Sequence, residues 1–347
     1  MSELGPRPDI EQMGEPEPRP DEEVFDLLQA ADHELVKKYQ PKFLARGGEH
    51  IVYDIPGHPD VVAKVEVESI KSPNFISPDD TEKIDELLAQ KRTRFLKMKS
   101  IFGANHVLAE RVFFMKVPVT DSVRKWVFEG RVPDTIKTDD VKETWAIVKI
   151  QHRALELQNQ ERSGIVGSYV EYRDPNLDAY RRITSALLEE DASAVFTREE
   201  FADLAGSPLK ELLEKADTDP LLTETLKDFV VKTIIYTKET GEMLDCAGFD
   251  NVPVWQEKDG TWNYRLVDAL YPGYQAEKKI DFARKALEMA SRGEKLDDEH
   301  FFPLLNMVNF TRLINGLAER LGIVERISFV PDELKGKIDY WKVLRND

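Results

Sequence analysis

The residues whose types and spacing could do chemistry lie in two stretches of the sequence. In the first, Gly47 and Gly48 precede two β-like segments, and Lys64 lies inside the second of these. Glycine has no Cβ, so its backbone N–H groups can approach phosphate oxygens closely. In the second stretch, Asn251 and Asp268 lie at the two ends of a predicted hairpin, and side-chain oxygens of these types suit Mg²⁺. Together the two stretches predict a site for a phosphate compound and a metal ion.

Lys64 lies among apolar residues, and strand geometry assigns it a face. Side chains alternate between the two faces of a strand, so Val62 and Lys64 share one face while Ala63 and Val65 share the other. Taken alone, the segment favours a surface lysine on a half-exposed strand. The glycine turn ahead of it favours the phosphate interpretation instead.

The stretch ahead of Asn251 contains a carboxylate and the single cysteine of the chain. Asp245 precedes Asn251 in the sequence. Cys246 follows directly, but no histidine or basic residue lies near it in the sequence to lower the pKa of its thiol. We therefore interpret Cys246 as a small packed residue and not as a nucleophile.

In this order, the segments resemble the nucleotide site of the protein-kinase-like superfamily, which includes small-molecule phosphotransferases such as aminoglycoside and choline kinases. The resemblance extends from about residue 43 to residue 272. The segment Val62–Lys64 resembles the Val-Ala-x-Lys strand of this superfamily. The resemblance implies that Lys64 contacts the α and β phosphates of ATP and that Val62 lines the adenine pocket.

The same resemblance assigns roles to the remaining candidates. It implies that Gly47 and Gly48 bind the phosphates and that Asn251 and Asp268 bind Mg²⁺. Asp245 would accept or orient the proton of the acceptor hydroxyl. The implied cofactors are therefore ATP and Mg²⁺.

The second stretch also departs from the kinase pattern. Five residues, and not four, separate Asp245 from Asn251, and Cys246 occupies the position where the usual spacing puts the aspartate. No His-Arg pair precedes Asp245, and Ala-Leu follows Asp268 where kinases have Phe-Gly. The glutamate that pairs with the strand lysine is not assignable, although Glu82 and Glu86 on the following helix are candidates.

Two functions stay open. The first is an ATP- and Mg²⁺-dependent phosphotransferase whose acceptor is a small molecule or a protein side chain. The second is a pseudokinase that acts as a nucleotide-binding or protein-interaction module. No Ala-Pro-Glu segment follows Asp268, which argues against a conventional Ser/Thr or Tyr protein kinase. A third interpretation is an unrelated α+β protein in which these segments coincide.

The predicted secondary structure that positions these residues is rich in strands in the first half of the chain and mainly helical in the second. A helix is expected over residues 80–102, and a hairpin over 252–267 is embedded in a mainly helical second half. The fold class is α+β, as a two-lobed kinase-like fold. Its β-rich N-lobe with one main helix covers residues 23–151, and its largely helical C-lobe covers 152–347. Strands are expected at 51–55, 61–67, 111–117 and 144–151.

Composition limits the location and the partners of the chain. Residues 1–22 are acidic and proline-rich, which predicts a disordered tail. The formal net charge of −17 argues against nucleic acid as a partner. No apolar run is long enough to span a bilayer, and the single cysteine cannot form an internal disulfide. We expect a cytoplasmic protein that binds a nucleotide and an unknown acceptor, without contact to a membrane.

Overall fold

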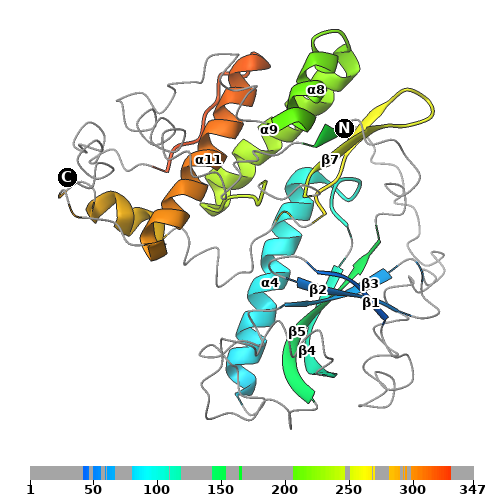
Figure 1. Cartoon of the computed structure of the whole chain (residues 1–347), viewed down its shortest axis with the longest axis vertical. Helices are drawn as coiled ribbons and strands as arrows, with labels where there is room; N and C mark the ends of the chain where they lie inside the picture. The colour runs from blue at the N-terminus through cyan, green and yellow to red at the C-terminus, as the bar shows by residue number, and fades with distance from the viewer. Residues whose placement is uncertain are drawn as a thin grey trace, which may run out of the picture. The chain divides into compact units, whose positions relative to one another are not determined.

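The computed structural model of the protein has mixed α and β structure, in agreement with the α+β class expected from the sequence. The chain divides into two compact units (Figure 1). Unit 1 comprises Met1–Pro78 and Glu110–Arg153, and unit 2 comprises Asp79–Ala109 and Ala154–Asp347. The structure describes residues 42–46, 50–55, 59, 61–66, 80–108, 110–118, 143–153, 164–165, 206–246, 251–267, 269, 281–289, 292, 294 and 298–329. The expected disordered tail over residues 1–22 lies outside these described residues.

Unit 1 contains a five-stranded antiparallel sheet in the order β1-β2-β3-β5-β4. Its first three strands form a meander, and the strand that comes last in sequence is inserted next to the third. The strands form where β-branched and aromatic residues alternate with other residues, as the sequence predicts. Their bounds are β1 (Lys42–Arg46), β2 (His50–Asp54), β3 (Val61–Glu66), β4 (Glu110–Pro118) and β5 (Glu143–His152).

The two faces of this sheet differ in chemistry. One face is apolar and forms the core of unit 1, because strands β2, β3, β4 and β5 contribute alternate residues to it. The opposite face carries the polar residues of the same strands, among them Lys64. The buried members of the apolar core are Ile51, Tyr53, Ile55, Val61, Val65, Val117, Ala146, Val148 and Ile150.

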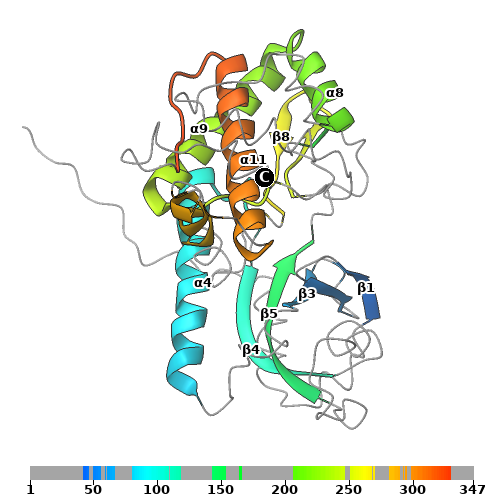
Figure 2. The same ribbon diagram turned by 60° about the vertical axis from the view of Figure 1, so that its left-hand side comes forward.

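Unit 2 is mainly helical and contains a small antiparallel sheet in the order β6-β7-β8. Helix α9 packs against three other helices and against β8, so it lies at the centre of this unit (Figure 2). Residues 281–289 are also helical. The bounds are α4 (Thr81–Phe102), β6 (Gly164–Ile165), α8 (Gly206–Ala216), α9 (Pro220–Thr240), β7 (Pro253–Gln256), β8 (Trp262–Tyr264) and α11 (Asp298–Arg320).

Helix α4 forms where the sequence predicts a helix, with a polar cap at one end and glycine at the other. The Asp80 side chain accepts a hydrogen bond from the Lys83 N–H, and Gly103 ends the helix with φ 91°. The ring of Phe102 contacts the rings of Phe229 and Tyr236 on α9. The expected N-lobe over 23–151 included this helix, whereas these contacts group it with unit 2.

Helix α9 has a well-defined start and end. Asp219 caps it by accepting from the N–H groups of Leu221 and Leu222, and Pro220 occupies the first helical position, where its missing N–H costs nothing. Gly241 ends it in the left-handed conformation at φ 71°, which glycine adopts without strain. Among the helices that the structure describes, none has the length and hydropathy of a membrane span.

Candidate functional site

The predicted site residues are divided between the two units and the undescribed part of the chain. Gly47, Gly48 and Asp268 lie outside the described residues. Val62 and Lys64 belong to β3 in unit 1, whereas Asp245 and Asn251 belong to unit 2.

Lys64 is buried within unit 1. Its side chain is only 7% exposed, which contradicts the interpretation as a surface lysine. Val62 is buried as well, and strand alternation puts both on the same face, as predicted. Across the sheet, Lys64 pairs with Val52 on β2 and with Lys149 on β5. Directly paired residues share a face, so two lysines lie side by side on this face.

Carboxylates accompany these lysines on the same face. Glu66 lies two residues after Lys64 and is buried. Glu110 on β4 has its Oε2 3.6 Å from the Lys149 Nζ and accepts a hydrogen bond of 3.3 Å from the Gln151 Nε2. Burying a charge is costly unless an opposite charge lies nearby, and the Glu110 carboxylate supplies that opposite charge for Lys149.

The acidic partner of Lys64 was expected on the helix that follows β3. Glu82 and Glu86, the two candidates on α4, are both exposed. Glu66 and Glu110 are acidic residues on the same sheet face as Lys64 and were not considered. The alternation of side chains along a strand, which put Val62 and Lys64 on one face, is the feature of the sequence that could have indicated them.

In unit 2, the predicted hairpin is confirmed as β7 and β8. Its turn contains Gly260 at φ 88°, and the Asp259 carboxylate accepts hydrogen bonds from the backbone N–H and the hydroxyl of Thr261. Asn251 lies just before β7, and Val267 lies just after β8. The hairpin thus brings Val267 close to Asn251.

Two hydrogen bonds join the segment that contains Asp245 to the two ends of this hairpin, and a third joins these ends to each other. The Asn251 Nδ2 donates to the main-chain carbonyl of Asp245 at 2.9 Å. The Val267 N–H donates to the Asn251 carbonyl at 3.0 Å, and the Asp245 N–H donates to the Ala269 carbonyl at 2.8 Å. The residues on both sides of Asp268 are therefore bonded to Asn251 and Asp245.

The spacing that departs from the kinase pattern has a structural explanation. Cys246 is buried in the core of unit 2, and burial raises the pKa of its thiol, with a smaller contribution from the nearby Asp245 charge. Met243 and Leu244 are buried in the same core, whereas Asp245 is only half-buried. An aspartate at position 246 would point into apolar surroundings. Among residues 243–246, Asp245 is the one that is not buried.

The segment ahead of Asp245 is anchored by a charged cluster. Glu242 accepts a hydrogen bond of 2.7 Å from the Arg94 Nε on α4 and one of 2.6 Å from the Tyr236 hydroxyl on α9. Burial is the main cause that raises the pKa of Tyr236, and the Glu242 charge adds to it. Two helices thus fix the backbone three residues before Asp245.

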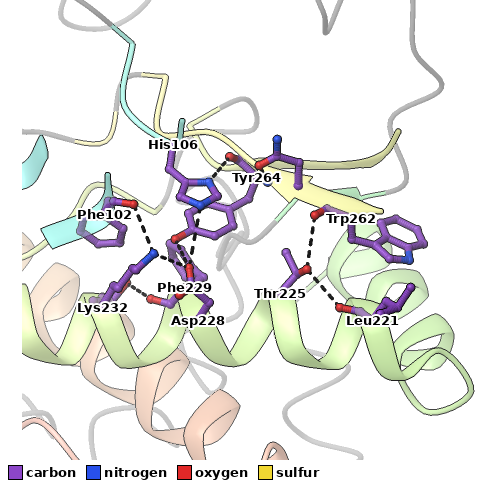
Figure 3. A network of polar contacts seen from close by, with 11 residues as sticks. Phe102, His106, Leu221, Thr225, Asp228, Phe229, Lys232, Trp262 and Tyr264 are labelled. Atoms are coloured by element: carbon purple, nitrogen blue, oxygen red, sulfur yellow. Dashed lines mark hydrogen bonds and ion pairs between the residues drawn. The ribbon is translucent and has the colours of Figure 1, made fainter. Parts of the chain in front are cut away.

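A second polar cluster lies on the other side of the hairpin and was missed by the sequence analysis (Figure 3). His106 stacks on the Tyr264 ring with centroids 3.9 Å apart, and its Nδ1 lies 2.9 Å from the Tyr264 carbonyl. Asp228 accepts hydrogen bonds from the Tyr264 hydroxyl at 2.8 Å and from the Lys232 Nζ at 2.7 Å. Only the i,i+4 spacing of Asp228 and Lys232 is visible in the sequence.

Comparison with known proteins identifies no relative. No family model, no curated protein and no solved structure matches the chain. Within the described residues, no three His, Cys, Asp or Glu side chains lie close enough together to bind a metal ion.

Proposed function

We propose that the protein is an ATP- and Mg²⁺-dependent phosphotransferase of the protein-kinase-like superfamily with a two-lobed kinase-like fold. The observation that carries this proposal is the set of hydrogen bonds joining Asp245, Asn251 and the residues on both sides of Asp268. The resemblance assigns these three side chains to the acceptor and the metal. These bonds join two separate segments of the sequence, since Asp245 bonds to Asn251 and to Ala269, the residue that follows Asp268.

The donor set fits a magnesium ion. The amide nitrogen of Asn251 is held by a carbonyl oxygen, which orients the amide oxygen away from that carbonyl. An amide oxygen and a carboxylate are ligands of the kind that Mg²⁺ prefers. Asn251 and Asp268 are therefore the residues that would hold the ion, which when bound would neutralise charge on the phosphates.

In the proposed reaction, the acceptor hydroxyl oxygen forms a bond to the γ-phosphorus of ATP, and the bond from that phosphorus to the β–γ bridging oxygen breaks. ADP leaves with the electron pair, and the hydroxyl proton passes to the Asp245 carboxylate. The half-buried position of Asp245 supports this role, because the carboxylate of a base must reach the substrate. The buried Lys64 is assigned to the phosphates, and Val62 to the adenine.

A second candidate function is a nucleotide-binding module that does not transfer phosphate. The observation that favours it is the exposure of Glu82 and Glu86, since neither matches the buried glutamate that pairs with the lysine in active kinases. In this case Lys64, Asn251 and Asp268 would bind the metal–nucleotide complex, and Asp245 would have no acceptor to deprotonate.

Thermal unfolding with ATP and Mg²⁺ tests nucleotide binding. A ligand at 100 times its dissociation constant stabilises the native state by about 2.7 kcal/mol. We expect this stabilisation for the wild type and its loss in Lys64→Ala and in Asp268→Asn. Matched controls are Lys116→Ala on β4 and Asp85→Asn on α4, which change exposed residues and should retain it. An unshifted wild type at millimolar nucleotide would contradict both candidate functions.

Turnover of ATP separates the two functions. For the phosphotransferase, we expect Asp245→Asn to slow ATP turnover by about 10²–10⁴-fold without weakening nucleotide binding. Binding without turnover in the wild type would favour the nucleotide-binding module. Equal turnover in wild type and Asp245→Asn would show that Asp245 is not the base.

A further inference from the structure

We propose that His106 is a positioning residue for the metal site, acting through the strand that leads to Asp268. This inference rests on the proposed function, in which Asp268 and Asn251 hold Mg²⁺. His106 lies in the short segment between α4 and β4, where it follows the helix-ending Gly103. This segment is bonded to the end of β8 and to α9, as the following contacts show.

The imidazole of His106 makes two contacts with Tyr264 on β8. The Nδ1 lies 2.9 Å from the Tyr264 carbonyl, and because a carbonyl can only accept, the Nδ1 carries the proton. The His106 and Tyr264 rings stack with an interplanar angle of 3°. His106 thus donates a hydrogen bond to the backbone carbonyl of Tyr264 and stacks on the Tyr264 side chain (Figure 3).

The backbone of the same segment extends the contact toward Asp268. The Leu266 N–H donates to the His106 carbonyl at 2.8 Å, and Val107 pairs with Leu266 in a parallel bridge. The next residue, Val267, donates to Asn251. A continuous set of bonds therefore runs from His106 through residues 264–267 to one metal ligand and to the residue before the other.

Two charged groups of helix α9, together with Arg265 after β8, lie near the imidazole. The Asp228 Oδ2 lies 3.9 Å from the His106 Nε2 and also accepts from the Tyr264 hydroxyl. Lys232 donates to Asp228 and, at 3.2 Å, to the carbonyl of Phe102 at the end of α4. Burial lowers the pKa of His106, the Tyr264 carbonyl and Asp228 oppose this shift, and the Lys232 and Arg265 charges add to it. The neutral, Nδ1-protonated imidazole is the form that this arrangement holds.

The position of the donor allows a sharp test, because two amides imitate different imidazole nitrogens. The amide nitrogen of an asparagine can take the place of Nδ1, whereas the longer glutamine places its amide nearer to Nε2. His106→Asn should therefore keep the hydrogen bond to the Tyr264 carbonyl, and His106→Gln and His106→Ala should lose it. The neighbouring exposed residue provides the control variant Asn105→Ala.

The first measurement is hydrogen exchange of the Leu266 and Val267 amides in the full-length protein without ligand. We expect faster exchange in His106→Ala and His106→Gln, and rates near those of the wild type in His106→Asn and Asn105→Ala. Unchanged exchange in His106→Ala would overturn the proposal. If His106→Ala does not fold, Tyr264→Phe takes its place. The Tyr264→Phe variant loses the hydrogen bond to Asp228 but keeps the carbonyl that His106 bonds to. It should therefore speed the exchange of the Leu266 and Val267 amides less than His106→Gln does.

The second measurement is a Mg²⁺ titration of the full-length variants at saturating ATP. We expect about tenfold weaker Mg²⁺ binding in His106→Gln, with recovery in His106→Asn and no change in Asn105→Ala. Faster amide exchange without weaker Mg²⁺ binding would mean that His106 is only structural, which would overturn the positioning role. A wild type that binds no Mg²⁺·ATP would instead overturn the proposed function, while the exchange data would still report how His106 holds β8.

Discussion

The side-chain amide of Asn251 donates a hydrogen bond to the main-chain carbonyl of Asp245. This bond closes the loop between the two residues and brings the segment that holds the proposed base to the start of the hairpin. Because it uses a backbone carbonyl, it fixes the loop without occupying the carboxylate of Asp245. The functional proposal depends on this relationship more than on any other in the structure.

The first prediction concerns this hydrogen bond. Asn251→Asp replaces the donating amide by a carboxylate that faces a carbonyl, so we expect a loss of about 1–3 kcal/mol in the free energy of unfolding. Urea unfolding measures it. Asn263→Asp is the matched control, because Asn263 on the same hairpin uses its oxygen to accept from the Tyr264 N–H, and an aspartate can do the same. Equal losses in both variants would mean that the added charge, and not the lost donor, is responsible.

The second prediction concerns Glu242, which anchors the segment before Asp245. Its carboxylate is only 14% exposed and neutralises Arg94, so Glu242→Ala leaves a buried guanidinium without this partner. We expect a loss of about 3–5 kcal/mol in the free energy of unfolding. Glu239→Ala, which removes a half-exposed carboxylate paired with Lys97, should cost no more than about 1 kcal/mol. Chemical denaturation of both variants checks the contrast, and a small loss in Glu242→Ala would contradict it.

The third prediction concerns the single cysteine. Cys246 is buried and burial raises the pKa of its thiol, so the native protein should not react with a thiol reagent at pH 8 while the urea-unfolded chain reacts. All labelling comes from this residue, because the chain has one cysteine. Ser100→Cys adds an exposed thiol on α4 and should react in the native state. Native labelling of Cys246 at the rate of the unfolded chain would contradict its place in the core.

The fourth prediction concerns pH and the cap of α9. A hydrogen bond of 2.7 Å from the Trp262 Nε1 is the main cause that lowers the pKa of Asp219 below 3.8, and the N–H groups of Leu222 and Leu221 add to it. A carboxyl with a lowered pKa contributes stability above its unfolded pKa, and this contribution is lost as the pH falls through its folded pKa. We expect Trp262→Phe to weaken this acid dependence between about pH 5 and pH 2.

Urea unfolding at several acidic pH values measures this effect. Asp219→Asn is the matched variant, since asparagine keeps the capping oxygen but does not titrate. Both variants should show a shallower decrease in stability with falling pH than the wild type. If the stability of Asp219→Asn decreased with falling pH as steeply as that of the wild type, this carboxyl would not contribute to the acid dependence.

The sequence predicted helix α4, strands β2, β3, β4 and β5 and the β7–β8 hairpin, but not the surfaces against which these elements pack. The helix over residues 80–102 is predicted within one residue of α4, because Asp80 and Gly103 give clear end signals. The pattern of apolar residues shows which face of α4 is buried, but it contains no information about the surface that covers it. The contact of Phe102 with α9 therefore appears only in the structure.

For the site, the sequence predicted residue types but not the bonds that join them. Strand alternation put Val62 and Lys64 on one face, and the hairpin signal placed Asn251 at its start. The bond from Asn251 to Asp245 depends on how the intervening loop closes, which no local pattern encodes. The burial of Cys246 confirms its interpretation as a small packed residue, whereas the half-buried position of Asp245 beside it could not be predicted, since neighbouring loop residues have no fixed periodicity.

The grouping of α4 with α9 has a consequence for the order in which the chain is synthesised. Helix α4 leaves the ribosome well before its partner, because roughly 120 residues separate their facing ends and synthesis adds about 5–20 residues per second. For several seconds the rings and aliphatic side chains that α4 later buries have no native surface to cover them. A nascent chain stalled before Pro220 should therefore bind chaperones that recognise apolar helices, and a chain extended beyond Gly241 should release them.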